Sequence, residues 1–164
     1  MRLRFGILTV SDRSARGERL DASGPALAEL VRSRGWEVVC QSILPDDLKT
    51  LSERLAAWAG GGDLDIILTT GGTGFAPRDV TPEATLAVVD RLAPGLAEAM
   101  RTESLKVTPH AMLSRAVAGI RGEVLIINLP GSPKAAVENL QVVLPALEHA
   151  VMLLREEPGA ETGH

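Results

Sequence analysis

The sequence predicts an α/β fold in three layers, α/β/α, with helices covering both faces of a mostly parallel central sheet. Short apolar runs bounded by turn residues alternate along the chain with longer segments of helical spacing. Three of these runs are apolar throughout, as in strands that helices cover on both faces. A chain of 164 residues, 45% hydrophobic and 23% charged, has the length and composition of one globular domain. We expect that domain to span residues 1–155 and a flexible tail to span 156–164.

The expected strands follow one another with a helix between most of them. Apolar runs at residues 5–10, 37–43, 66–70 and 124–128 predict the parallel part of the sheet. Residues 108–121 are ambiguous: a short helix near Met112 precedes a run at 116–120 that is expected to pair antiparallel at the sheet edge.

The expected helices carry apolar residues on one face. They span residues 25–34, 48–59, 82–91, 95–105 and 133–155, and the pair Ala93-Pro94 separates the third from the fourth. Pro145 lies inside the last helix, where a missing backbone donor is expected to bend or interrupt it.

The composition argues against some classes of partner and favours one compartment. The net charge is −4, no Lys/Arg-dense stripe occurs, and aromatic residues make up 2% of the chain, which argues against nucleic acid. Cys40 is the single cysteine, so an intrachain disulfide and a cysteine-cluster metal site are excluded, and a reducing compartment is favoured. The N-terminus lacks a signal-peptide pattern and no apolar run approaches a membrane span. We therefore expect a cytoplasmic protein without a membrane partner.

The loops after the strands are the places to look for a site, because ligands of doubly wound folds bind beyond the carboxyl ends of the strands. After the first strand come Ser11 and Asp12, and then Ser23 and Gly24 at the start of a helix. Helix capping alone is the favoured explanation of that loop. After the second strand, Asp46 and Asp47 are adjacent; one is a helix cap, and Asp46, nearer the strand end, is the better candidate for a site.

The loop after the third strand is the most informative. Three glycines within four residues let backbone amides approach a ligand, threonine hydroxyls add donors, and Thr81 is expected to cap the next helix. A tight turn explains the first two glycines, but not the arginine and aspartate that follow. The pattern is not a Rossmann or a Walker A motif, since the required further glycine and the Gly-Lys pair are missing. The candidate residues here are Thr70, Gly71, Gly72, Thr73, Gly74, Arg78 and Asp79.

The loop after the fourth strand has the same pattern, a tight turn followed by a helix cap. Asn128, Pro130 and Gly131 precede Ser132, which is expected to cap a helix whose amide end carries partial positive charge. A cap after a tight turn explains this segment taken singly. Four such loops at one sheet edge favour a site.

The chemistry of these loops is restricted. None contains a histidine or cysteine, so a Ser-His-Asp or Cys-His mechanism and a zinc site lack their parts. Hydroxyls, amides, arginine and carboxylates suit phosphoryl or nucleotidyl transfer, in which carboxylates hold Mg²⁺. A phosphate nucleophile is already anionic at neutral pH and needs no general base.

Eight ordered segments between residues 5 and 155 resemble the molybdenum cofactor biosynthesis family that includes the bacterial MogA and MoaB proteins, the gephyrin G domain and its plant counterpart. The segments are Thr9-Val-Ser-Asp12, Asp21-Ala-Ser-Gly-Pro25, Leu44-Pro-Asp46, Thr70-Gly-Gly-Thr-Gly74, Pro77-Arg-Asp-Val-Thr-Pro-Glu83, Glu103-Ser-Leu105, Met112-Leu-Ser-Arg115 and Asn128-Leu-Pro-Gly131.

The resemblance implies a molybdopterin adenylyltransferase, in which the terminal phosphate of molybdopterin attacks the α-phosphorus of Mg-ATP and releases pyrophosphate. It assigns Asp46 and Asp79 to catalysis and to Mg²⁺, and Ser104 to the substrate site. It also implies a homotrimer, with a molybdenum-insertion protein as a further partner. The expected substrate- and phosphate-binding residues are Ser11, Asp12, Ser23, Gly24, Thr70, Gly71, Gly72, Thr73, Gly74, Arg78, Ser104, Ser114, Asn128, Pro130, Gly131 and Ser132.

An alternative is left open. A MoaB-like or non-catalytic pterin-binding or scaffold protein of the same pathway carries the same glycine loop. The sequence does not select between molybdenum and tungsten or name the acceptor of the product.

Overall fold

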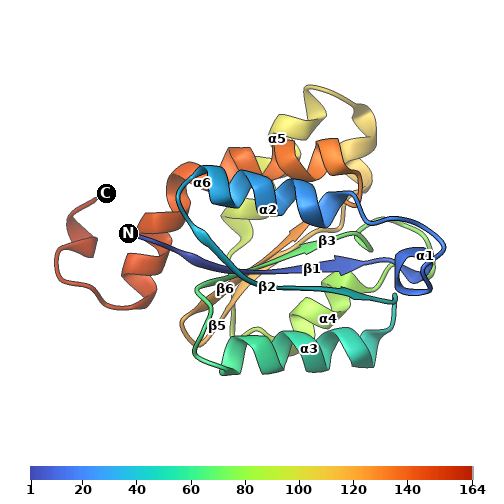
Figure 1. Ribbon diagram of the computed structural model, residues 1–164. Helices are drawn as coiled ribbons and strands as arrows, with labels where there is room; N and C mark the ends of the chain where they lie inside the picture. Colours follow the sequence, from blue (N-terminus) through green and yellow to red (C-terminus); the bar gives the residue numbers. More distant parts are fainter. Residues whose placement is uncertain (164) are drawn as a thin grey trace.

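The computed structural model describes residues 1–163 and has one six-stranded sheet at its centre (Figure 1). The strand order is β2-β1-β3-β6-β5-β4. The first four of these are parallel, β5 runs antiparallel to β6, and β4 runs antiparallel to β5. The strands are β1 (Arg4–Val10), β2 (Glu37–Leu44), β3 (Ile66–Thr70), β4 (Arg91–Leu92), β5 (Ala118–Arg121) and β6 (Val124–Leu129).

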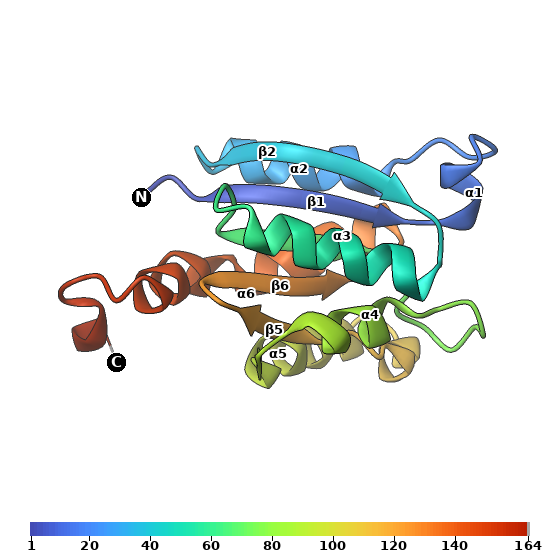
Figure 2. The same ribbon diagram turned by 90° about the horizontal axis from the view of Figure 1, so that it is seen from below.

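Helices cover both faces of the sheet. Figure 1 shows α2 (Ser23–Ser33), α5 (Pro94–Leu105) and α6 (Pro133–Leu154) on one face, and α3 (Leu48–Gly60) and α4 (Thr81–Val88) on the other. The view in Figure 2, turned by 90°, shows α3 lying lengthwise over one face of the sheet, where it contacts β3. Three short helices complete the described chain: α1 (Asp12–Ala15), η1 (Pro109–Leu113) and η2 (Ala160–Gly163). The three-layer fold is therefore confirmed.

Two hydrophobic cores lie on the two faces because successive strand residues point in opposite directions. Along β1, Ile7 belongs to the core beneath α2 and α6, and its neighbour Leu8 belongs to the core beneath α3 and α4. In β6 the same division separates Ile127 from Ile126. All residues of β3 and β6 are buried, which explains their largely apolar sequence.

The strands expected at 5–10, 37–43, 66–70 and 124–128 are present, and the antiparallel pairing expected after residue 116 is found between β5 and β6. The position of β5 at the edge was wrong, since β4 takes that place. The helix expected over 82–91 ends at Val88 because Val89 is extended and the amide of Asp90 donates to the carbonyl of Ile120. This pairing turns Arg91–Leu92 into a strand.

The last helix, α6, is continuous through Pro145, so the interruption expected there is absent. By length and composition α6 is the one helix among the described residues that could cross a membrane. This finding corrects the expectation that no run approaches a span. Leu140, Leu144 and Leu147 of α6 nevertheless lie in the core against the sheet, and a core helix passes the same test.

The segment after α6 was expected to be a flexible tail, and no observation tests that expectation. Within it, η2 forms and Ala160 is buried, while residue 164 lies outside the described residues. At the other end of the molecule, the carboxyl ends of β1, β2, β3 and β6 lie at one edge of the sheet. The loops that follow these strands form the candidate site.

Candidate functional site

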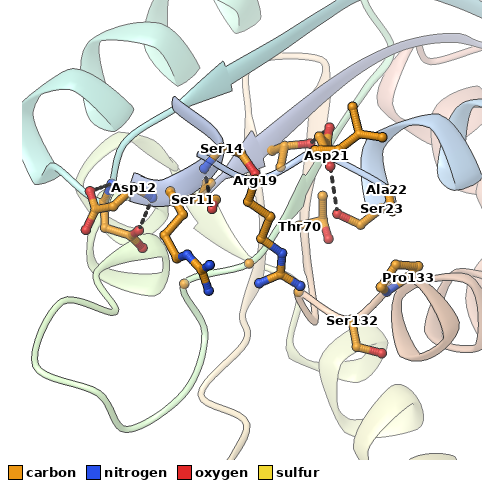
Figure 3. A pocket seen from close by; sticks show the side chains of 18 of the residues that line it. Ser11, Asp12, Ser14, Arg19, Asp21, Ala22, Ser23, Thr70, Ser132 and Pro133 are labelled. Atoms are coloured by element: carbon orange, nitrogen blue, oxygen red, sulfur yellow. Dashed lines mark hydrogen bonds between the residues drawn. The ribbon is translucent and has the colours of Figure 1, made fainter. Parts of the chain in front are cut away.

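A cleft of about 470 Å³ opens at the carboxyl ends of the parallel strands. Its walls come from the loops after β1, β2, β3 and β6, as the sequence predicted, and Figure 3 shows their side chains converging on it. Ten of the predicted residues line it together: Ser11, Asp12, Ser23, Asp46, Thr70, Gly71, Gly72, Asp79, Gly131 and Ser132.

The acidic end of the cleft is built from two aspartates that hold each other's backbone. The amide of Asp12 donates to Oδ2 of Asp46 at 3.0 Å, and the amide of Asp46 donates to Oδ1 of Asp12 at 3.0 Å. Arg78 closes the arrangement with two bonds to Asp12, from Nε at 2.9 Å and from Nη2 at 2.8 Å. The ends of β1 and β2 and the end of the glycine loop are thereby joined.

The two aspartates differ in charge compensation. The hydrogen bonds from Arg78 lower the pKa of Asp12, so Asp12 is ionised over the whole neutral range. Burial raises the pKa of Asp46, and the neighbouring carboxylates of Asp12 and Asp79 raise it further. A carboxylate whose charge is incompletely compensated in a cleft is a candidate cation ligand.

The adjacent residues Asp46 and Asp47 have different roles, one in the cleft and one as a helix cap, as the sequence suggested. Asp47 is the N-cap of α3 and accepts a hydrogen bond from the amide of Thr50 at 2.9 Å. Asp46 does not cap the helix and lines the cleft instead.

The glycine turn is held by the fold itself. Gly71 and Gly72 have φ values of +99° and +69°, which favour glycine. A Cβ on Gly71 would contact the carbonyl oxygen of Val10, and one on Gly72 would contact Oγ1 of Thr81. Thr81 was expected to cap α4, but Val80 is the N-cap position and the Thr81 hydroxyl donates to the carbonyl of Gly71 at 2.9 Å. Gly71 is therefore required by the close approach of a backbone carbonyl, and Gly72 by the close approach of a side-chain hydroxyl.

The same turn leaves a run of amides without acceptors. The N–H groups of residues 72–75 donate no hydrogen bond to any acceptor within residues 1–163, whereas the amide of Ala76 donates to Oδ2 of Asp79 at 3.1 Å. Successive unpaired amides in a glycine turn form a concave site for anionic oxygen. The turn thus places amide donors beside the carboxylates of Asp46 and Asp79.

The opposite wall is the start of α6. The Thr70 hydroxyl donates to the carbonyl of Pro130 at 2.7 Å, which joins the ends of β3 and β6. Ser132 caps α6 as predicted, its hydroxyl accepting from the amide of Ala135 at 3.2 Å. The amide end of a 22-residue helix lies at this side of the cleft.

Eight predicted residues do not line the cleft. Gly24, Thr73, Gly74, Arg78 and Pro130 belong to its loops but are not among the residues that line it. Asn128 is fully buried, donates to the hydroxyls of Thr69 and Thr85, and accepts from the amide of Val117. Ser104 accepts a hydrogen bond from Asn139 in a separate hollow between α5 and α6, and Ser114 accepts one from the amide of Ala116. Ligand contact by these residues stays a prediction.

Comparison with known proteins decides the family. The sequence pattern of the family described as "Probable molybdopterin binding domain" matches residues 6–149. The chain belongs to this molybdopterin-binding domain family. A protein named molybdopterin adenylyltransferase from Helicobacter pylori (strain J99) is 41% identical over 93% of this chain and 88% of its own length. One of that name from Escherichia coli (strain K12) is 42% identical over 92% and 78%. Gephyrin from Dictyostelium discoideum is 44% identical over 93% of this chain, which spans only 23% of that protein.

Solved structures agree with this molybdopterin-binding fold. A structure described as the molybdopterin biosynthesis enzyme MoaB from Thermus thermophilus is 52% identical, covers 95% of this chain and 98% of its own, and has a TM-score of 0.89. A structure of MogA is 40% identical over 92% and 99%, with a TM-score of 0.87. The adenylyltransferases and the MoaB structure are thus matched along most of their length.

The molybdopterin-binding domain also has cleft residues that the sequence did not reveal. Arg13 and Arg19 line the cleft, and Figure 3 shows the Arg19 side chain extending into it. Asp21 accepts hydrogen bonds from the Thr9 hydroxyl and from the amide of Gly24 in the first turn of α2. The N-cap position of α2 is Ala22, so the cap expected at Ser23 or Gly24 was wrong. The signal was a loop of unusual length between β1 and α2 that is rich in arginine.

The donor set of this domain fits Mg²⁺ only together with a phosphorylated ligand. Oδ1 of Asp46 and Oδ1 of Asp79 accept no hydrogen bond within residues 1–163, so each aspartate has an oxygen available. In that range no group of three or more His, Cys, Asp or Glu could hold a metal ion. Mg²⁺ is commonly bound by one or two carboxylates, water and substrate phosphates, and two aspartates meet that requirement.

Proposed function

We propose that the protein is a molybdopterin adenylyltransferase of molybdenum cofactor biosynthesis. The observation that carries the proposal is the cleft itself, which sets two carboxylates with free oxygens beside a run of unpaired amides. Relatives that bear this name are 41–42% identical over more than nine-tenths of the chain. The substrates are molybdopterin and ATP, and the products are adenylylated molybdopterin and pyrophosphate.

The residues of the cleft have complementary roles in this reaction. Asp46 and Asp79 would hold Mg²⁺, which would neutralise negative charge on the phosphates of ATP during adenylyl transfer. The amides of residues 72–75 donate hydrogen bonds to phosphate oxygens, in the manner of preorganised donors aimed at developing charge. The attacking group is a phosphate that is already ionised, so no side chain has to remove a proton. This agrees with a cleft whose lining contains no histidine or cysteine.

The same proposal includes the compartment, the oligomeric state and the partner of the enzyme. We infer a cytoplasmic homotrimer that passes its product to a molybdenum-insertion protein, with residues 1–155 as the single catalytic domain. Because the chain spans only about a quarter of gephyrin, the other activities of such longer relatives are not part of the proposal.

A second candidate is a pterin-binding protein without ATP chemistry. The chain is 52% identical to the structure described as the enzyme MoaB and 40% identical to that of MogA, so a MoaB-like role stays beside the adenylyltransferase. The two candidates differ in nucleotide binding: an adenylyltransferase gains stability with saturating Mg-ATP, because a ligand of the folded state raises Tm. An unchanged Tm would favour the pterin-binding protein.

The direct test is a product assay. Purified protein is incubated with molybdopterin and Mg-ATP, and the mixture is analysed by mass spectrometry for adenylylated molybdopterin together with released pyrophosphate. We expect both products in equal amounts. Folded protein that yields neither product would exclude the proposed reaction.

A further inference from the structure

Arg115 lies outside the cleft, between η1 and β5, yet it contacts the glycine loop at several points. Its Nε donates to the carbonyl of Gly74 at 2.7 Å, and its Nη2 donates to the carbonyl of Asp79 at 2.7 Å. Its own backbone amide donates to the carbonyl of Thr73 at 2.8 Å. Three carbonyls of one loop are thus fixed by a single residue.

The direction of these bonds determines which way the amides of the loop point. In a trans peptide the N–H points away from the C=O, and no cis peptide occurs in the described chain. Because the carbonyls of Thr73 and Gly74 point at Arg115, the amides of Gly74 and Phe75 point away from it. These two amides belong to the run at 72–75 that has no acceptor within residues 1–163.

The third carbonyl bond acts on the proposed metal ligand. Asp79 is held through its main-chain oxygen by Arg115, while its side-chain Oδ2 accepts from the amide of Ala76. The backbone of Asp79 is thereby fixed by a residue outside the cleft, and Oδ1 of this cleft-lining aspartate is left without a hydrogen bond within residues 1–163.

Glu83 on α4 orients the guanidinium. Its two carboxylate oxygens accept from Nη1 of Arg115 at 3.0 and 2.8 Å. Nε, Nη1 and Nη2 each donate to a different residue, which requires the planar guanidinium of arginine with its several donors. A lysine ammonium is a single point on a flexible stem and cannot reach Gly74, Asp79 and Glu83 at once.

We propose that Arg115 is a positioning residue for the nucleotide side of the reaction: it holds the 73–79 loop so that the amides and the Asp79 carboxylate meet Mg-ATP. The inference rests on the proposed function for the identity of the ligand. Arg115 touches no substrate and acts through the loop. Loss of an outer partner of a metal-ligating carboxylate commonly costs 10–100-fold in metal affinity or activity.

The test compares Arg115→Lys with Arg101→Lys, a matched control that contacts the same segment. Arg101 donates to the carbonyls of Ser114 and Ala116 and makes no contact with the glycine loop. Calorimetry measures the Kd of Mg-ATP alone for the wild type and both variants, and the Kd of molybdopterin in parallel. We expect about 10–100-fold weaker Mg-ATP binding for Arg115→Lys, a higher Mg²⁺ requirement, and molybdopterin binding unchanged within about twofold. Arg101→Lys should bind both ligands as the wild type does.

A double-mutant cycle identifies the route of the effect. If Arg115 acts through Asp79, then Arg115→Lys should weaken Mg-ATP binding by much less in an Asp79→Asn background than in the wild type. Equal losses in both backgrounds would show that Asp79 is not the route. Wild-type Mg-ATP affinity in Arg115→Lys, or an equal loss in Arg101→Lys, would overturn the inference. A wild type that binds Mg-ATP but forms no adenylylated pterin would refute the proposed reaction while leaving this comparison intact.

Discussion

The two ends of the sheet differ in how they compensate the charge of an aspartate. At the amino ends of the strands, Asp65 is 2% exposed and accepts hydrogen bonds from the backbone and side chain of Arg4 and from Arg155. Burial opposes its ionisation, but these bonds prevail and lower the pKa of Asp65. At the carboxyl ends, Asp46 lies near Asp12 and Asp79, and its pKa is raised by burial and by these neighbours.

The difference shows which end is built for a ligand. The charge of Asp65 is fully compensated by the protein, so it joins β1, β3 and the end of α6 and contributes stability. The carboxylates at the cleft repel one another, which costs stability unless a cation is present. Such a local cost is common at functional sites. The following variants test this contrast. Loss of turnover in Asp79→Asn comes first, and the other variants follow in order of their expected change in stability, from the largest to the smallest.

Asp79→Asn should abolish most of the proposed turnover without unfolding the protein. Removing one preorganised electrostatic group of an active site commonly costs on the order of 10²–10³ in rate. The measurement is the initial rate of adenylylated molybdopterin formation, with circular dichroism as the control for folding. Turnover at the wild-type rate would remove Asp79 from the mechanism.

Asp65→Asn should lower stability while leaving the cleft intact. Loss of hydrogen bonds to charged partners is expected to reduce the free energy of unfolding by about 2 kcal/mol, measured by urea denaturation at neutral pH. Because the native pKa of Asp65 is lowered, its contribution is present at neutral pH and is lost as pH falls through that native pKa. The difference between variant and wild type should therefore shrink in acid. A difference that is the same at both pH values would contradict the ion-pair explanation.

Asp47→Ala should lower Tm by a few degrees, because α3 loses its N-cap. Activity should stay at the wild-type level, since Asp47 does not line the cleft. Thermal unfolding and the product assay on the same preparation test both statements. A large loss of activity would show that the two adjacent aspartates share one role.

Asp46→Asn should raise Tm slightly at neutral pH, by about one or two degrees, while activity is lost. Asparagine keeps an oxygen for the amide of Asp12 and removes the charge that Asp79 repels. A raised native pKa means that ionisation of Asp46 reduces stability as pH rises from the unfolded to the native pKa. The gain in Tm of Asp46→Asn over the wild type should thus be full above the native pKa of Asp46 and should vanish below its unfolded pKa. A fall in Tm at neutral pH would contradict the proposed charge repulsion.

The sequence predicted the parallel strands and the positions of four loops because local signals encode them: continuous apolar runs, Asp47 and Ser132 as caps, and glycine turns. It did not predict β4, because two exposed residues become a strand only when Asp90 pairs with Ile120. Long-range hydrogen bonds leave no mark on a local pattern.

In the candidate site, too, the features that the sequence did not predict depend on contacts between distant residues. The Asp12–Asp46 clamp joins residues 34 positions apart, and the burial of Asn128 depends on hydroxyls from β3 and α4. Arg19 and Arg115 are charged residues in loops. Arg115 ends one of the segments that carry the family resemblance, but no local pattern assigns a role to either arginine. Only their contacts show that Arg19 enters the cleft and that Arg115 holds the loop.

One measurement tests most directly whether the chemistry lies at the carboxyl ends of the strands. Wild type, Asp79→Asn and Asp65→Asn are assayed side by side for adenylylated molybdopterin, at a temperature well below the Tm of each. We predict that Asp65→Asn is less stable but active, and that Asp79→Asn is folded but nearly inactive. An active Asp79→Asn beside an inactive, folded Asp65→Asn would contradict the assignment of the active site to the cleft.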